Sequence, residues 1–243
     1  RVRCSGAPGI LECMGSRAGR VIGRIVTGLV VLTLTIGAVW AYQNRQDISD
    51  HFAAQNFTPT QEVVDLADRI MPTSAGERVF LASHPTLDAS QVFNDQCSDV
   101  DHTEGGHVLG CFSGGRIHLF KVTDERLDGI VEVTAAHELL HAAFSRLSDA
   151  EAAQLTAQLT SAYAELAGSD PALAERMEVY RGLSEAAFTN ELHSVLGTEV
   201  RELPAELEAH YARWFEDRAV IVDFFDAYHQ VFTELRARAD QLQ

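Results

Sequence analysis

Basic residues are scarce in this chain outside its N-terminal segment. Residues 1–46 hold six of the 19 basic residues beside one acidic residue, so residues 47–243 carry the other 13 basic residues against 34 acidic ones. A body so acidic repels nucleic acid and anionic membrane surfaces, and it has no basic patch that would contact phosphates. We therefore expect no nucleic-acid partner.

Long uncharged runs are also scarce, and a single one is long enough to span a membrane. Residues 25–44 carry no charge and lie between Arg24 and Arg45. As a helix, 20 residues span about 30 Å, the thickness of a bilayer core. Arginines precede the run, and Trp40 and Tyr42 lie where interfacial aromatic residues are expected. The positive-inside tendency then predicts a single-pass protein of the cell membrane, with its N-terminus in the cytoplasm.

This reading divides the chain into three parts: a basic cytoplasmic segment (1–24), a transmembrane anchor (25–44) and an extracytoplasmic domain (45–243). A cleaved signal peptide is the alternative, but its apolar region usually runs about 7–15 residues. The body is exported in either case. The chain starts with Arg, whereas Met14 would open an ordinary basic leader. We therefore expect residues 1–13 to be an over-extended start and exclude them from the fold.

Cysteine is rare, and two of the four cysteines lie within residues 1–13. The exported body retains Cys97 and Cys111, which are expected to pair in an oxidising compartment. Closing a loop of about 15 residues stabilises a fold by roughly 3 kcal/mol in the chain-entropy model. The alternative is a structural zinc site that adds His102 and His107 to the two cysteines. Export favours the disulfide.

The sequence of the first half of the body predicts short helices and strands. Residues 59–70 have the apolar spacing of an amphipathic helix with Pro near its start. Residues 77–83 read as a strand, and residues 84–106 read as a loop. Two strand-like runs, 107–113 and 116–122, flank Gly114-Gly115 and predict a hairpin.

From residue 127 onward the pattern is helical. A mostly apolar helix is predicted over 127–147, and a capping box at Ser148-Asp-Ala-Glu151 opens a second helix that continues to about residue 166. Further helices are expected to start at Pro171, Glu185 and Pro204, the last one continuing or bending towards residue 242. The fold class is therefore α+β, in which one transmembrane helix precedes a small antiparallel sheet or hairpin and then a helical majority.

The predicted helix over 127–147 contains 134-TAAHELLHAAF-144. His137 and His141 are four residues apart and so project from one helix face, where one Zn²⁺ can bind both at about 2.0–2.1 Å. Glu138 lies about 100° further round the helix, within reach of a water on the metal. In metalloproteases with this H-E-x-x-H arrangement, zinc lowers the pKa of the water and the glutamate accepts its proton. Structural histidines are the alternative, but buried imidazoles without partners are costly, and a metal satisfies both.

These residues resemble the zincin signature, and 190-NELHSVLG-197 resembles the second motif of the gluzincins, the thermolysin-like branch. The family pattern is Asn-Glu-x-x-Ser-Asp before an apolar pair and Gly. The resemblance implies that Glu191 is the third zinc ligand and that water takes the fourth position. Asn190 and Ser194 match the pattern. Val195 stands where the family has an Asp that supports a zinc-bound histidine, so that support must come from elsewhere.

Alternatives stay open around this motif pair. The metzincin branch does not fit, because 141-HAAFSRL-147 lacks its Gly and third His. His193 is a rival to Glu191 as third ligand, and its alternative role is that of a partner or polar core residue. Zincins place a strand beside the active-site helix for an extended peptide, and the run 116–122 is our candidate for that edge, with an ordinary core strand as the alternative. His210 and Tyr211 are the candidates for oxyanion stabilisation, and otherwise they pack their helix.

The sequence therefore predicts zinc-dependent hydrolysis of peptide bonds at the outer face of the membrane. His137, His141 and Glu191 would hold the zinc, and Glu138 would be the general base and then the proton donor to the leaving amine. The substrate would be a peptide or protein. The alternative is a catalytically silent, zinc-containing envelope protein that binds a partner, because a set of ligands indicates a metal and not turnover.

Overall fold

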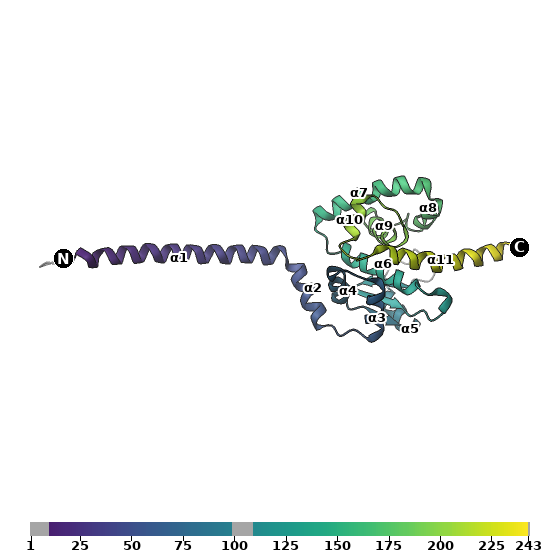
Figure 1. The fold of residues 1–243 in the computed structure, drawn as a ribbon, viewed down its shortest axis with the longest axis horizontal. Coiled ribbons are helices and arrows are strands. Elements are labelled where there is room, and N and C mark those ends of the chain that lie inside the picture. Colours follow the sequence, from purple (N-terminus) through teal and green to yellow (C-terminus); the bar gives the residue numbers. More distant parts are fainter. Residues whose placement is uncertain (1–9, 99–108, 243) are drawn as a thin grey trace. The chain divides into compact units, whose positions relative to one another are not determined.

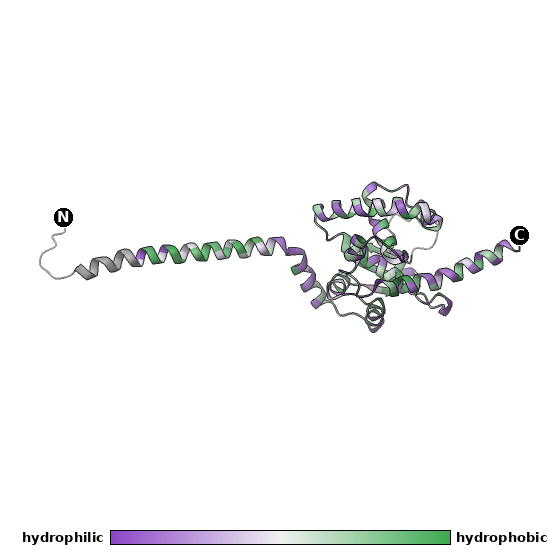
Figure 2. Ribbon diagram, turned by 45° about the horizontal axis from the view of Figure 1, so that its top comes forward, coloured by the Kyte–Doolittle hydropathy of each residue, from purple (hydrophilic) through white to green (hydrophobic). Residues whose placement is uncertain are grey.

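The computed structural model describes residues 10–98 and 109–242, with backbone alone for residues 10–18. The chain divides into two compact units, Arg1–Ser49 and Asp50–Gln243. The first unit contains helix α1 (Ile10–Gln43) and the first residues of α2 (Arg45–Asn56). Within the described ranges, Gly19–Gln43 is the one helical stretch long and apolar enough to cross a membrane, and its apolar residues run along α1 in Figure 2. A signal sequence passes the same test, so the protein has a candidate membrane span near its N-terminus.

The second unit is mostly helical and contains a small sheet, which confirms the broad α+β prediction (Figure 1). Each helix begins close to a start that the sequence predicted, and a short 3₁₀ turn, η1 (Glu125–Leu127), precedes α6. The helices are α3 (Gln61–Ile70), α4 (Ser74–Ala82), α5 (Ser90–Cys97), α6 (Ile130–Phe144), α7 (Asp149–Ser169), α8 (Pro171–Glu178), α9 (Glu185–Glu199), α10 (Ala205–Tyr211) and α11 (Arg218–Asp240). The exceptions are α4 and α5, which were not predicted as helices, and α11, whose start was not predicted.

α4 corrects the strand predicted over residues 77–83. The side chain of Thr73 accepts a hydrogen bond from the Gly76 amide at 3.1 Å and so caps this helix. Val79 and Phe80 are then buried on the face of α4 that packs against α6. A short apolar run fits a buried helix as well as a strand, and here the cap and the neighbouring α6 decide.

Within the residues that the structure describes, the sheet has three strands in the order β1-β3-β2. β2 (Gly110–Ser113) and β3 (Arg116–Phe120) form the predicted antiparallel hairpin around two glycines with positive φ, Gly114 and Gly115. β1 (Thr86–Asp88) pairs in parallel with β3, so the sheet is mixed and the prediction of a wholly antiparallel sheet was wrong. β1 and α5 both lie in the segment that was predicted to be loop.

α6 is the central helix of the second unit. It contacts α3, α4, β2 and β3 on one side and α9 and α11 on the other. In Figure 1 it lies between the lower group of α3–α5 with the sheet and the upper group of α7–α10. Its residues Leu139 and Leu140 are fully buried. Polar residues on this helix therefore lie at the junction of two groups of elements.

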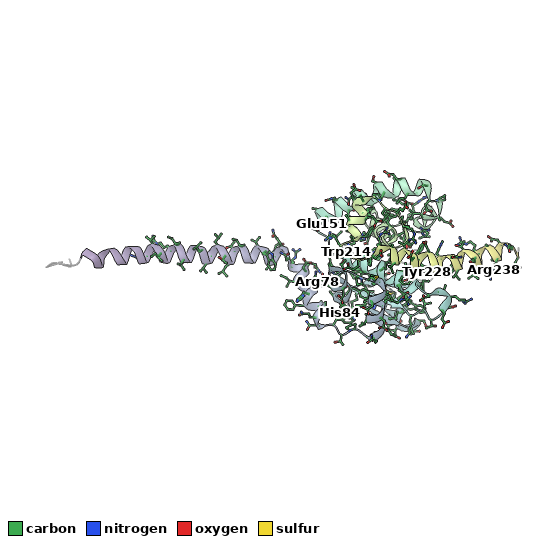
Figure 3. All side chains as sticks on the ribbon, viewed as in Figure 1. Arg78, His84, Glu151, Trp214, Tyr228 and Arg238 are labelled. Carbon is green, nitrogen blue, oxygen red and sulfur yellow. A yellow bond between two sulfur atoms is a disulfide. The ribbon has the colours of Figure 1, made fainter. Side chains whose placement is uncertain are left out.

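The last predicted helix is interrupted. α10 ends at Tyr211, and α11 begins at Arg218, where the side chain of Asp217 accepts a hydrogen bond from the Ala219 amide at 3.0 Å. The first turns of α11 are buried in the body. Beyond Tyr228 the helix extends past the body towards Arg238, as Figure 3 shows.

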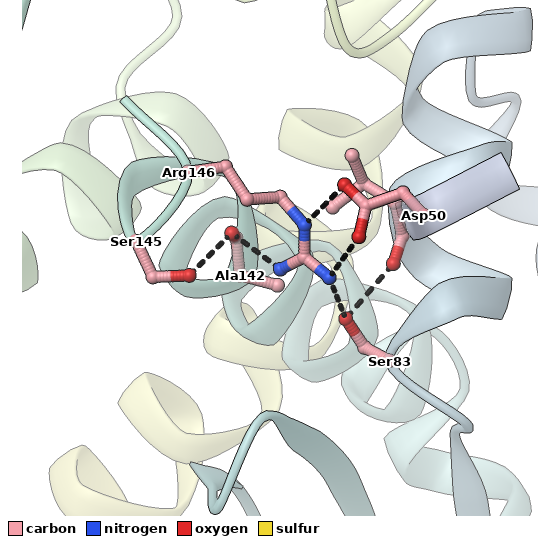
Figure 4. A network of polar contacts seen from close by, with 6 residues as sticks. Asp50, Ser83, Ala142, Ser145 and Arg146 are labelled. Atoms are coloured by element: carbon pink, nitrogen blue, oxygen red, sulfur yellow. Dashed lines mark hydrogen bonds and ion pairs between the residues drawn. The ribbon is translucent and has the colours of Figure 1, made fainter. Parts of the chain in front are cut away.

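A buried ion pair joins the start of the second unit to the end of α6 (Figure 4). The guanidinium of Arg146 donates to both carboxylate oxygens of Asp50, at 2.8 and 3.1 Å. It also donates to the carbonyl of Ala142 at 2.8 Å and to the hydroxyl of Ser83 at 3.3 Å. The side chains of Arg146 and Asp50 are 12% and 6% exposed, so this pair is shielded from solvent.

Candidate metal centre

The structure brings together His137, His141 and Glu191, the three residues that the sequence predicted as zinc ligands. The two imidazoles lie one turn apart on α6, with ring centroids 4.7 Å apart. An oxygen of the Glu191 carboxylate, on α9, is 3.5 Å from the Nε2 atom of each imidazole. One ligand atom from each residue can be chosen so that all three lie within 4.8 Å of one another. This group could hold a metal ion.

α9 reaches this position because it packs closely against α6. Gly197 makes the approach possible, since a Cβ atom at this residue would lie 2.4 Å from a methyl carbon of Leu140 and 2.6 Å from the ring of Tyr211. One turn earlier, the hydroxyl of Ser194 donates to the carbonyl oxygen of His137 at 3.2 Å. The two contacts fix α9 beside the turn of α6 that carries the histidines.

The electrostatics of the group favour an ionised carboxylate. Burial alone would raise the pKa of Glu191, but hydrogen bonds from His137 and His141 and their charge outweigh this and hold the pKa below its ordinary range. The three side chains are 15%, 9% and 22% exposed, in the order His137, His141 and Glu191. The group is therefore largely shielded, and Glu191 is its most exposed member. Two imidazoles and one carboxylate are a donor set that suits Zn²⁺.

Glu138 is buried on α6 beside the histidines and faces the sheet. A Cβ atom at Gly110 would lie 2.9 Å from the Glu138 carboxylate and 2.5 Å from the methyl group of Thr134. The missing side chain at Gly110 therefore lets β2 pass directly over α6 at this glutamate. Sequence reasoning did not identify this residue as part of the site, although a lone Gly in a strand is typical of close backbone approach.

Among the described strands, β2 is the edge strand near the site, and the run 116–122 is the core strand that was the alternative for it. β3, which covers most of that run, lies between β1 and β2 and is the central strand. Its backbone groups pair with strands on both sides. The edge position expected for this run was wrong, because β1 pairs with β3 from a segment that carries no strand pattern.

Glu191 and His193 were rivals for the third ligand position, and only Glu191 lies in the group. His193 is fully buried, its Nε2 atom is 2.9 Å from Nε2 of His210, and its ring stacks on Tyr211 at 5.3 Å. Burial, with a smaller effect of the neighbouring His210, lowers the pKa of His193 well below its ordinary value. His193 is a neutral core residue in this structure.

The two candidates for oxyanion stabilisation also contact His193. The Tyr211 hydroxyl donates to the His193 carbonyl at 2.7 Å, and complete burial raises its pKa. Burial and, to a smaller extent, Arg213 lower the pKa of His210 to about 4. Both side chains therefore hold α10 against α9.

Residue 195 gives the two imidazoles of the candidate metal group no polar support. Val195 is buried and apolar. The Nδ1 atom of His141 is buried and has no hydrogen-bond partner among the described residues. The structure thus departs from the gluzincin pattern at the position where the sequence also departs from it.

Cys97 and Cys111 form a disulfide, as predicted. It joins the end of α5 to β2, next to Gly110. Because the two sulfur atoms are bonded to each other, the alternative zinc site built on these cysteines is excluded. His102 and His107, its other proposed ligands, lie outside the described residues.

Comparison with known proteins adds no family or fold assignment: no family model, no curated protein and no solved structure matches this chain. The functional argument therefore depends on the residues of the site and their geometry.

Proposed function

We propose that the chain is a zinc-dependent peptidase of the gluzincin type, anchored in the membrane with its body outside the cell. The observation that carries the proposal is the convergence of His137, His141 and Glu191 within 4.8 Å, from two helices that are far apart in sequence. Glu138 lies on the same turn of α6 as His137, where a general base is needed. A chance HExxH pattern would not be expected to meet a carboxylate from a second helix.

The donor set fits a catalytic zinc site, which typically has three protein ligands and a fourth position for water or substrate. A zinc ion bound there would supply Lewis-acid chemistry, lowering the pKa of water and polarising the carbonyl of the scissile bond. His137, His141 and Glu191 hold the ion in this proposal. The partial exposure of Glu191 leaves an approach for the substrate.

Glu138 moves the proton. Its carboxylate accepts a proton from the attacking water and passes it to the leaving amine, so that one residue is base and then acid. The fixed backbone of β2 over Glu138 restricts the directions in which this side chain can turn. Restricted rotation keeps the carboxylate aimed at the reacting atoms.

The substrate would be an extended peptide that pairs with the edge strand β2. Edge strands present unpaired N–H and C=O groups, and peptides bind to them by adding a strand. Gly110 lies at the start of β2 and directly against Glu138, so a peptide along this edge would pass the general base. The acidic body would disfavour anionic peptides.

The test uses the full chain in detergent micelles, a panel of unstructured peptides and a Glu138→Gln variant. We expect the native chain to bind one zinc ion and to hydrolyse peptides, and a chelator to abolish the activity. Glu138→Gln should bind zinc equally well and lose about 10²–10⁴-fold in rate, the usual contribution of a positioned general base.

Two outcomes would contradict the proposal. An active Glu138→Gln variant would remove the residue from its assigned role. A native chain that binds zinc with high affinity but hydrolyses no peptide would favour a silent, zinc-containing envelope protein that binds a partner. In that case a chelator would change the stability of the protein, and there would be no peptidase activity for it to remove.

A further inference from the structure

Ser194 lies at the contact between the two helices that carry the metal group. We infer that it is a positioning residue, whose hydroxyl sets the place of α9 on α6 and thereby the distance from Glu191 to the two imidazoles. The inference rests on the proposed metal site and adds to it a residue that contacts neither the metal nor the substrate.

The contact links two ligands through their own helices. Ser194 is fully buried, and its hydroxyl donates to the carbonyl oxygen of His137 at 3.2 Å. Ser194 follows Glu191 by three residues on α9, so the two side chains lie about one turn apart on neighbouring faces. The hydrogen bond therefore joins the backbone of one ligand to the helical turn next to another.

The acceptor atom has a second function within α6. In an α-helix the carbonyl of residue i accepts from the amide of residue i+4, so the carbonyl of His137 belongs to the turn that ends at His141. A donor that binds this oxygen therefore keeps a fixed position relative to both histidines. Any slide of α9 along α6 would lengthen the bond and move Glu191 away from them.

A metal site allows only small errors in the distances between metal and ligands, so the position of α9 along α6 has to be fixed. Ligand distances have to fall within about 0.2 Å of their preferred values, whereas the rise between neighbouring residues on a helix is about 1.5 Å. The Glu191 side chain has several rotatable bonds and is 22% exposed, so its own contacts fix the position of its helix only loosely. The Ser194 side chain is short and fully buried, so its hydrogen bond can hold α9 in place before a metal binds.

Thr198 provides a matched control on the same helix. It is also fully buried, and its hydroxyl donates to the carbonyl of Ser194 at 2.8 Å. That bond stays within α9 and does not reach α6. Removing either hydroxyl deletes one buried hydrogen bond, but only Ser194 connects the two ligand-bearing helices through it.

The experiment compares the full chain in micelles with its Ser194→Ala and Thr198→Ala variants. Zn²⁺ affinity is measured by competition with a chromophoric chelator, and the Tm of each protein is measured without metal. We expect Ser194→Ala to bind Zn²⁺ about tenfold more weakly, the lower end of the loss for groups that orient metal ligands. Thr198→Ala should stay within about twofold of the native affinity, although it lowers the metal-free Tm at least as much as Ser194→Ala, because it loses a buried methyl group as well as a hydroxyl.

Bound Co²⁺ supplies a second readout, because its visible spectrum reports ligand geometry. The spectrum should change in Ser194→Ala and stay native in Thr198→Ala. Equal affinities and spectra in the two variants would overturn the positioning role while leaving the metal site intact. A native chain that binds neither ion would overturn both proposals, and a native chain that binds zinc without hydrolysing peptides would overturn only the peptidase.

Discussion

Glu191 and His193 show how two neighbouring residues of one helix can have different surroundings. Residues i and i+2 of an α-helix point in directions about 200° apart. Glu191 faces the imidazoles of α6, whereas His193 packs between Phe144 and Tyr211. Both side chains are candidate ligands in the sequence. The face of α9 that packs against α6 decides that Glu191, and not His193, lies beside the two imidazoles.

This separation leads to a prediction for two substitutions. Glu191→Ala should weaken zinc binding by roughly 100-fold, since in four-ligand structural zinc sites, worth about 10–16 kcal/mol, each protein ligand contributes about 3 kcal/mol. Its metal-free Tm should fall less than that of His193→Gln, because Glu191 keeps 22% of its side chain exposed whereas His193 is fully buried. His193→Gln should lower the Tm further and leave the zinc stoichiometry at one. Chelator competition and thermal unfolding measure the two effects. If His193→Gln lost zinc and Glu191→Ala did not, His193 would be the ligand and Glu191 would not.

At the scale of single elements, local sequence signals predicted those structures that local contacts stabilise. The capping box at Ser148 and Glu151 starts α7 as expected. The Gly-Gly turn forms the hairpin between β2 and β3. Helix α6 was predicted from its apolar pattern, and the common face of His137 and His141 follows from their spacing along that one helix.

The elements that were missed depend on partners far away in the chain. β1 has three residues and forms because β3, about 30 residues later, offers a parallel edge. α4 was taken for a strand since Val79 and Phe80 suit either structure, and burial against α6 selects the helix. The same limit applies to the site: Gly110 could not be linked to Glu138 before the sheet and α6 were seen together.

The close packing of α9 on α6 predicts a large effect of one added methyl group. In Gly197→Ala the new Cβ would meet Leu140 and the ring of the fully buried Tyr211. Overpacking of this kind costs about 1–3 kcal/mol, and α9 can relieve it only by moving away from α6. We expect a lower Tm together with weaker zinc binding.

Gly168→Ala on α7 is the control for this substitution, because no atom lies within 4 Å of a Cβ at that residue. Alanine also has the higher helix propensity, so this variant should unfold at the native Tm or slightly above it. Native zinc affinity in Gly197→Ala would show that the distance between the helices does not control the metal group.

At the scale of the whole molecule, the chain joins a candidate membrane helix to an acidic body. The second unit begins at Asp50, and this residue is already 95% buried through its pairing with Arg146. Arg146 lies two residues beyond the end of α6, so the first residue of the body is fixed to the helix that carries the histidines. The functional body therefore includes part of α2 and does not begin at α3.

This boundary is testable with substitutions and truncations. Removing one partner of a buried ion pair leaves the other charge unpaired and costs about 3–5 kcal/mol. Asp50→Asn in the full chain should lower the Tm by roughly 6–12 °C, the shift expected for about 3 kcal/mol in a domain of this size. Asp47→Asn, an exposed acidic residue in the first turn of the same helix, should leave the Tm unchanged. A body that starts at residue 45 should likewise unfold at a higher temperature than one that starts at residue 51, and equal Tm values for the two bodies would place the boundary after α2.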